Sequence, residues 1–150
     1  YLIHEDLQKN MQYNVGIIRT KKEIIDGIER IDKMKEEFKE VKAAGSSQFN
    51  PGWHEALALR NLLISSEAVA KSALLREESR GAHTREDFPD ENKDWLEYNI
   101  INRKGKDGKM ETIKERRGNP EAELKRIANS SIEELESEVK KDHEKLMSKV

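Results

Sequence analysis

The residues with the most obvious potential for chemistry lie in one run, REESRGAHTREDFP, which spans residues 76–89. Ser79, His83 and Asp87 follow one another at intervals of four residues, and serine hydrolases combine these residue types as nucleophile, base and orienting acid. A continuous helix would align such a set on one face. Gly81 and the terminal proline interrupt that helix, so the favoured interpretation is a helix end whose polar groups are satisfied locally.

The arginines of the run indicate a different role, in ion pairing. A guanidinium keeps its charge, and its planar fork suits bidentate pairing with carboxylates. The charged residues available in the run are Arg76, Arg80 and Arg85 with Glu77, Glu78, Glu86 and Asp87. Gly81 would allow a sharp turn that presents His83. The network either anchors the loop within this domain or reaches across to another domain, and in both cases we expect no catalytic residue here.

Other common kinds of site are not indicated. The histidines are far apart in the sequence, no HExxH spacing occurs, and cysteine is absent, so we predict no metal ligands. Neither GxGxxG nor GxxxxGK[ST] is present, so we predict no cofactor-binding residues in this chain. The formal net charge of −2 gives no general attraction to nucleic acid, and the basic residues between 103 and 117 are typical of a soluble turn.

The composition favours helices with narrow apolar stripes. Charged residues make up 39% of the chain, against about 25% in typical domains. No apolar run approaches the roughly 20 residues of a membrane-spanning helix, so we expect no direct membrane insertion. The chain begins at Tyr1 without an initiator methionine and enters helix-like sequence directly, which we interpret as a piece of a longer protein.

Periodicity and capping signals predict the elements that position the run. Apolar residues at intervals of three and four predict helices over about 3–15, 21–42 and 51–80. A capping box at Thr20 and an Asn-Pro pair begin the second and third of these. The third helix is apolar around much of its circumference, which indicates a central position. Alternation about an Asp-Gly turn predicts a β-hairpin over about 95–115, and a capping box at Ser131 begins a last helix over about 132–148.

Two long segments of this sequence resemble a known family. NPGWHEALALRNLLISSEAVAKSALLREESRGAHTREDFP, residues 50–89, is similar to the C-terminal helical domain of the flavoprotein subunit of succinate dehydrogenase and fumarate reductase. LQKNMQYNVGIIRTKKEIIDGIERI, residues 7–31, resembles the same family, as does the hairpin that follows Trp95. The resemblance covers about residues 5–115. L-aspartate oxidases share an ESRG-x-H segment and remain the alternative family. The NPGWH sequence at the start of the third predicted helix favours the dehydrogenase and reductase branch.

The resemblance implies a mainly α fold and a role in a larger enzyme. It implies a three-helix antiparallel bundle with a small hairpin, following an FAD-binding domain and a capping domain. It also implies succinate–fumarate interconversion with FAD in the parent protein and electron transfer to an iron–sulfur subunit. The family's catalytic residues lie in the earlier domains, so the chain alone is expected to be inactive. The residues carried over as interdomain support are Arg76, Glu78, Ser79, Arg80, Gly81, His83, Arg85 and Asp87.

The organisation and the alternatives follow from the same resemblance. We expect a helical domain with its hairpin over residues 1–118, and a charged helical extension over 119–150 that packs on it or projects from it. The parent would be cytoplasmic and peripheral to the inner face of the membrane through partner subunits. Two alternatives remain: a free-standing helical module that binds a protein partner, and a small hydrolase that uses His83 with a carboxylate.

Overall fold

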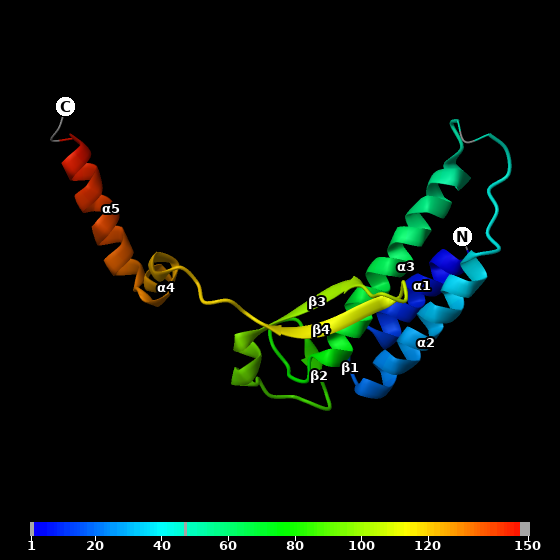
Figure 1. Cartoon of the computed structure of the whole chain (residues 1–150), viewed down its shortest axis with the longest axis horizontal. Helices are drawn as coiled ribbons and strands as arrows, with labels where there is room; N and C mark the ends of the chain where they lie inside the picture. The colour runs from blue at the N-terminus through cyan, green and yellow to red at the C-terminus, as the bar shows by residue number, and fades with distance from the viewer. Residues whose placement is uncertain (1, 47, 148–150) are drawn as a thin grey trace. The chain divides into compact units, whose positions relative to one another are not determined.

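The computed structural model describes the backbone of residues 2–46 and 48–147 and the side chains up to Lys141 (Figure 1). Two compact units divide the chain, Tyr1–Arg116 and Arg117–Val150. The predicted mainly α class with a small hairpin is confirmed. In the described part of the chain, none of the helices combines the length and the apolar character needed to cross a membrane.

The first unit contains a bundle of three antiparallel helices (Figure 1). They are α1 (Leu2–Asn14), α2 (Lys21–Phe38) and α3 (Pro51–Leu75), and each contacts the other two. Their shared core is apolar and consists of Leu7, Val15, Ile24, Ile31, Met34, Leu59, Leu63, Ala70 and Ala73. The short link between α1 and α2 enforces their antiparallel arrangement, because it leaves no length for a crossover.

The helix starts follow the local signals in the sequence. The Thr20 hydroxyl accepts a hydrogen bond from the backbone N–H of Glu23, and the Glu23 carboxylate accepts one from the Thr20 N–H at 2.7 Å. The Asn50 side chain accepts from the Trp53 N–H at 3.3 Å, with Pro51 in the first helical position. Both predicted starts are confirmed, because each cap satisfies backbone donors that the first helical turn leaves free.

The predicted ends of the second and third helices were wrong by several residues. The second helix ends at Phe38 rather than about 42, since Lys39, Glu40 and Val41 donate to carbonyls three residues back in tighter turns. The third ends at Leu75 rather than about 80. Arg76 has an extended ψ of 98°, and carbonyls of the last turn of α3 accept hydrogen bonds from a distant arginine side chain instead of from the next helical turn.

Close approach of α1 and α2 depends on Gly27. Its carbonyl accepts a hydrogen bond of 2.9 Å from the buried Asn10 side chain. A Cβ added to Gly27 would lie 2.9 Å from the Val15 Cγ2 atom and 3.1 Å from the Asn14 Cβ atom. Because Val15 is a buried branched side chain with little freedom to move, the two helices would have to separate.

Gly27→Ala should therefore destabilise the chain, although the same exchange in an open helix interior stabilises by about 1 kcal/mol. We expect a loss of about 1–3 kcal/mol in the free energy of unfolding, measured by urea denaturation. Gly118→Ala is the control, because a Cβ there meets nothing within 4 Å, and it should change stability by less than about 0.5 kcal/mol. Equal or increased stability in Gly27→Ala would contradict the close packing.

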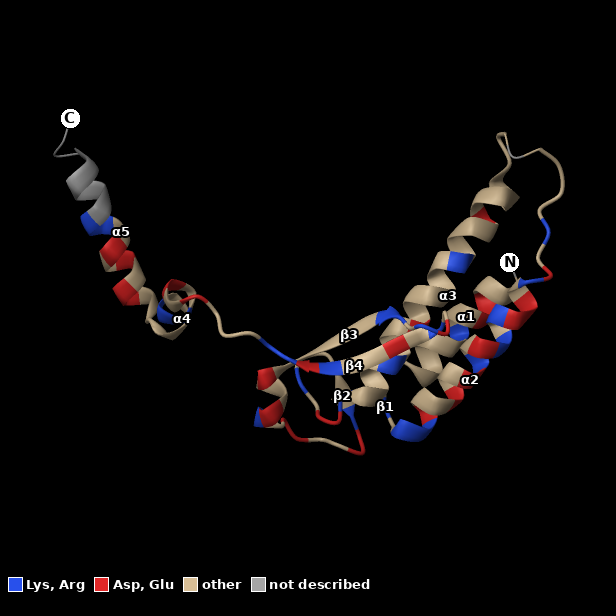
Figure 2. Cartoon of the chain, viewed as in Figure 1, with Lys and Arg blue, Asp and Glu red and all other residues tan. Residues whose placement is uncertain are grey.

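The central helix α3 is apolar on more than its buried side. Figure 2 shows few charged residues on α3, where the charged positions are Glu55, Arg60, Glu67 and Lys71, whereas α2 carries many charges of both signs along its length. The face with Leu59, Leu63 and Ala70 is buried against the other helices. Trp53, Leu57, Leu62, Ile64 and Val69 lie on the flanks of α3 and remain between 41% and 50% exposed. The prediction that the third helix is central, with neighbours packed around it, is thus only partly met, because elements of this chain cover one face of α3 and leave its flanks half exposed.

The hairpin lies against α3. Strands β3 (Tyr98–Lys104) and β4 (Met110–Arg116) pair antiparallel with Ile101 opposite Ile113. Residues Lys93–Glu97 form the 3₁₀ turn η1, so the first part of the predicted hairpin is not strand. Lys71 of α3 donates to the Met110 carbonyl at 3.1 Å, and the Asn102 side chain donates to the Ser72 hydroxyl at 2.8 Å. Side-chain hydrogen bonds thus attach both strands to α3.

The second unit contains two helices, α4 (Ala122–Asn129) and α5 (Ile132–Met147). Ser131 and Glu134 form the predicted capping box, with hydrogen bonds of 2.9 and 3.2 Å. Arg126 of α4 bonds to Glu123 on its own helix and to Glu138 of α5. The last helix was predicted over about 132–148, and residue 148 lies outside the described residues.

Candidate functional site

The support segment, defined as residues 76–88, is a loop that folds back over the end of α3. Arg85 is fully buried at its centre. Its Nη1 atom donates to the carbonyls of Ala73 and Leu74 at 3.0 and 3.2 Å, and to that of Arg76 at 3.3 Å. These carbonyls belong to the C-terminal end of α3, where no further helical turn can satisfy them. Arg85 therefore caps the helix from a position nine to twelve residues further along the chain.

The remaining donors of Arg85 hold Asp87. Nε and Nη2 donate to the two carboxylate oxygens at 2.8 and 2.6 Å, which is a bidentate pair. The hydrogen bonds from Arg85 lower the pKa of Asp87 below its ordinary value. Asp87 also accepts from the backbone N–H of Lys21, the first residue of α2, at 3.3 Å. One ion pair thus connects the end of α3 with the start of α2.

Glu78 forms a second buried centre. Its carboxylate is fully buried and accepts from Arg76 at 2.6 and 2.8 Å, from Arg80 at 3.1 Å, and from the Asn92 N–H at 2.9 Å. Burial alone would raise the pKa of this carboxyl group. The hydrogen bonds from Arg80, Asn92 and Arg76 outweigh burial and lower the pKa to about 2. Glu78 is therefore an anion at neutral pH, and two cations neutralise it.

A short parallel pairing, which the sequence analysis did not predict, attaches the support segment to the link between α1 and α2. Strands β1 (Ile18–Arg19) and β2 (Thr84–Arg85) are two residues long. The Thr84 N–H donates to the Ile17 carbonyl and the Glu86 N–H to the Arg19 carbonyl, both at 3.1 Å. Residues more than sixty positions apart are thereby held in register.

Arg19 and His83 make the side-chain contact across this pairing. Arg19 Nη2 lies 2.6 Å from His83 Nδ1, and His83 Nε2 lies 3.1 Å from the Arg76 carbonyl. Because a guanidinium can only donate, Nδ1 must accept, and the ring proton is therefore on Nε2 and is donated to the carbonyl. Arg19 also donates to the carbonyls of Val15 and Gly16, which directly follow the end of α1. His83 is thus held as a neutral imidazole between two structural hydrogen bonds.

The serine of the segment is structural as well. The Ser79 hydroxyl accepts from the Arg85 N–H at 2.9 Å and donates to the Phe88 carbonyl at 2.8 Å. Gly81, with φ of 59°, allows the turn in which Arg80 and His83 exchange backbone hydrogen bonds of 2.8 and 3.0 Å. The hydrogen bonds of Ser79, His83 and Asp87 all go to other groups, so the geometry excludes a hydrolase triad built from these three residues.

Burial and three nearby guanidinium groups lower the pKa of His83 below its ordinary value of 6.5. Burial acts most strongly, and the positive charges of Arg19, Arg76 and Arg85 add to it. The unfolded chain therefore takes up a proton near pH 6.5, where the folded chain does not. The stabilisation from neutral His83 is complete above pH 6.5 and declines as the pH falls below it.

The free energy of unfolding should consequently decrease between about pH 7.5 and 5.5, and His83→Gln should flatten this decrease, as measured by urea denaturation at each pH. His54, which is exposed in the first turn of α3, provides the control. His54→Gln should keep the wild-type dependence on pH. An unchanged dependence in His83→Gln would contradict the neutral, buried state of this side chain.

The structure brings together all eight residues of the predicted support motif and adds partners that the sequence analysis missed. Arg19 is the main addition, together with Asn92 and Trp95. Trp95 is buried, and the guanidinium of Arg76 lies 5.5 Å from the centre of its ring. The role of Arg19 could have been predicted from its position in the tight link between two helices. Such a link leaves carbonyls at the end of the first helix without a backbone donor, and an arginine side chain can supply one.

The sequence and the fold are similar to those of known flavoproteins. The family described as fumarate reductase flavoprotein C-term matches residues 4–142. A polypeptide of the fumarate reductase (CoM/CoB) of Methanothermobacter marburgensis is 36% identical over 102 residues, which are 68% of this chain and 19% of that protein. The succinate dehydrogenase flavoprotein of Rickettsia bellii is 38% identical over 96 residues, 63% of this chain and 16% of that protein.

Solved structures give the same result. The Mycobacterium smegmatis Sdh1 complex in the apo form matches 80% of this chain with 40% identity and a TM-score of 0.75, over 21% of that chain. An Escherichia coli quinol fumarate reductase matches 71% of this chain with 28% identity and a TM-score of 0.66, over 19% of that chain. This chain spans about a fifth of the length of these relatives.

Proposed function

This chain belongs to the family of fumarate reductase flavoprotein C-terminal domains, and on that premise we propose that it is the helical support domain of a flavoprotein that interconverts succinate and fumarate. Its role is to hold the FAD-binding and capping domains of the parent protein in register. The observation that carries this proposal is the contrast between a polar network in the support segment whose partners lie within this same unit and exposed apolar side chains directly beside it.

The polar network makes the support segment rigid without a partner. Glu78 and Arg85 are fully buried, and their partners are side chains, carbonyls and amides of this same unit. Of the two interpretations of the run, this favours internal anchoring as the role of its charged groups. Rigid placement of reacting groups is what hydride transfer requires, and a domain outside the active site can supply it.

The apolar side chains beside the network supply the docking surface in this proposal. Ile17 and Ile18 of the α1–α2 link are 65% and 63% exposed, and they lie at the strand that pairs with the support segment. Tyr13, near the end of α1, is 75% exposed. Exposed apolar groups on a rigid base are typical of an interface.

In this proposal FAD is bound by the other domains of the parent protein. The residues of this chain do not fit a dinucleotide: the sequence has no Gly-rich fingerprint, and in the described part the only parallel pairing is two residues long. We therefore assign this chain no flavin contact and no catalytic step. By analogy with the relatives, an iron–sulfur partner and a peripheral location at the inner face of the membrane are proposed for the whole complex.

The test is reconstitution from two polypeptides, the present chain and the FAD-binding and capping domains of its parent. The two should co-purify, and Ile18→Lys should weaken their association at least about tenfold, because burial of one such side chain contributes about 1.5–3 kcal/mol. Val41→Lys, an exposed apolar position after α2, is the matched control and should keep wild-type affinity.

Two further readouts make this test decisive. The present chain alone should show no flavin absorbance and no succinate oxidation, and the reconstituted pair should show both. A yellow isolated chain, or association that Ile18→Lys and Val41→Lys weaken equally, would contradict a support domain that docks through the link between α1 and α2.

A further inference from the structure

A groove of about 660 Å³ lies on the first unit, on the side of the hairpin. The end of α3 and the hairpin supply apolar lining through Leu74, Leu75, Trp95 and Met110. The groove borders the support segment, because Trp95 contacts Arg76 and Glu77 is part of the lining. None of the hydrogen bonds described above for that segment comes from the lysine side chains of the groove. The lining combines an apolar floor with the ammonium groups of three lysines, and the function proposed above assigns no role to this combination.

Contacts place two of these ammonium groups at the groove wall. Lys114 Nζ lies 4.0 Å from the centre of the Trp95 ring and 4.1 Å from that of Tyr98. Lys71 Nζ lies 3.1 Å from the Met110 carbonyl oxygen. Because Trp95 and Met110 themselves line the groove, both ammonium groups are next to its interior.

The groove is cationic, although the chain as a whole is not. Lys21 is the third lysine of the lining, and Glu77 is its one carboxylate. Lys71 Nζ is already paired with the Glu67 carboxylate at 2.7 Å, and Glu67 and Asp32 together neutralise Lys71 and Lys35. The positive charge that remains in the groove therefore comes from Lys21 and Lys114. The formal net charge of the chain is −2, so attraction of an anion to this groove would be local rather than a general property of the surface.

We propose that this groove binds a small organic anion that carries carboxylate or phosphate groups. The ammonium groups of Lys21 and Lys114 pair with its charges, and its carbon skeleton lies on the apolar floor beside Trp95. Ligand sites commonly combine an apolar lining with a few fixed polar groups. The rings of Trp95 and Tyr98 hold the Lys114 ammonium at the wall in the absence of a ligand, so little ordering is needed on binding.

Trp95 can report on this site directly. The chain contains two tryptophans, so Trp53→Phe leaves Trp95 as the only one. Trp53 lies in the first turn of α3, at the end of the helix that is remote from the groove, and it is not part of the groove lining. An anion that draws Lys114 from the Trp95 ring should change the emission of Trp95. Titration of Trp53→Phe with citrate and with pyrophosphate, at constant ionic strength, should give a saturable change for at least one of them.

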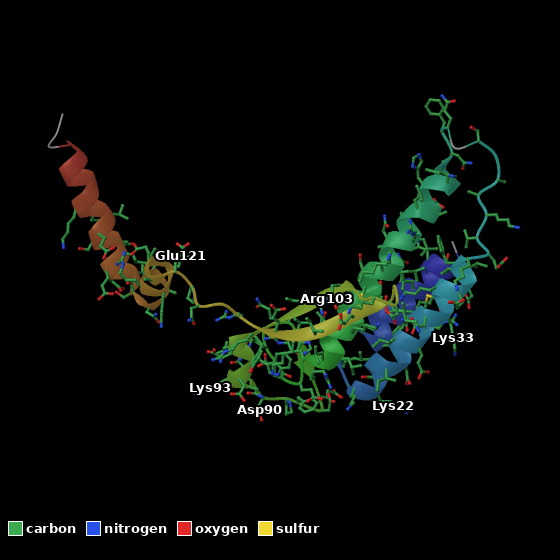
Figure 3. The ribbon with its side chains drawn as sticks, in the orientation of Figure 1. Lys22, Lys33, Asp90, Lys93, Arg103 and Glu121 are labelled. Atoms are coloured by element: carbon green, nitrogen blue, oxygen red, sulfur yellow. The ribbon has the colours of Figure 1, made fainter. Side chains whose placement is uncertain are left out.

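Calorimetric titration of matched variants locates the binding. Lys21→Gln combined with Lys114→Gln should weaken the affinity about tenfold, since each exposed ion pair contributes up to about 1 kcal/mol. Lys22→Gln combined with Lys33→Gln removes the same charge from the outer side of α2 and should stay within about twofold of wild type (Figure 3).

The outcomes separate the two ligand chemistries from the absence of a site. Saturation by citrate alone assigns the groove to carboxylates, and saturation by pyrophosphate alone assigns it to phosphates. The lack of a saturable response to both, or equal weakening in the two double variants, would overturn the proposal, because only non-specific attraction would then remain.

Discussion

Replacement of Arg85 by methionine is expected to lower the free energy of unfolding by about 3–5 kcal/mol, because it removes the buried partner of the half-buried Asp87 and, at the same time, the donor to the carbonyls at the end of α3. Methionine keeps much of the length of the side chain but donates no hydrogen bond. The variant leaves Asp87 without its bidentate partner and leaves the carbonyls of Ala73 and Leu74 without their donor. Urea denaturation followed by circular dichroism measures this loss.

Arg103→Met is the matched control. Arg103 pairs with Glu111 across the exposed hairpin at 2.9 Å, and both side chains are largely exposed. Exposed pairs contribute about 0–1 kcal/mol, so this variant should remain close to wild type. A loss in Arg85→Met no larger than that in Arg103→Met would show that the capping of α3 by Arg85 is not important for stability.

Glu78→Gln is expected to cost about 2–4 kcal/mol at neutral pH, because it leaves Arg76 and Arg80 facing a neutral amide in a buried position. The two arginine side chains are 29% and 27% exposed, and partial hydration keeps the expected loss below that of a fully buried pair. Glu91→Gln is the control, since Glu91 pairs with the same Arg80 but is 63% exposed, and it should cost less than about 1 kcal/mol.

The loss in the free energy of unfolding caused by Glu78→Gln should become smaller as the pH falls. The folded pKa of about 2 lies below the ordinary value of 4.5, so the stabilisation by Glu78 is complete above pH 4.5 and is lost as the pH falls toward 2. The difference in stability between wild type and Glu78→Gln should therefore shrink between about pH 5 and pH 3. A difference that stays constant over this range would mean that Glu78 does not act through its charge.

Local signals predicted where the elements begin. Thr20 with Glu23, Asn50 with Pro51, and Ser131 with Glu134 each place a cap and its partner within three residues, so the interaction can be identified without the fold. The three helices, the hairpin and the last helix follow from such caps and from periodicity. Their type is a local property, and it was predictable for that reason.

Features that depend on distant residues could not be predicted in this way. The end of α3 at Leu75 depends on Arg85, which folds back over it. The β1–β2 pairing involves two residues on each side, too few for an alternating pattern, and joins segments far apart in the sequence. The resemblance singled out the residues of the support segment, but their inward orientation was not predictable, because the burial of Glu78 and Arg85 depends on the whole unit.

Hydrogen–deuterium exchange at the Thr84 and Glu86 amides, with and without the FAD-binding and capping domains, tests the central claim most directly. These amides donate to the Ile17 and Arg19 carbonyls of the proposed docking link. The account predicts protection in the isolated chain, because the segment is rigid by itself, and further slowing when the other domains are added. Rapid exchange in the isolated chain, or no change on addition, would contradict a preformed support that docks through this link.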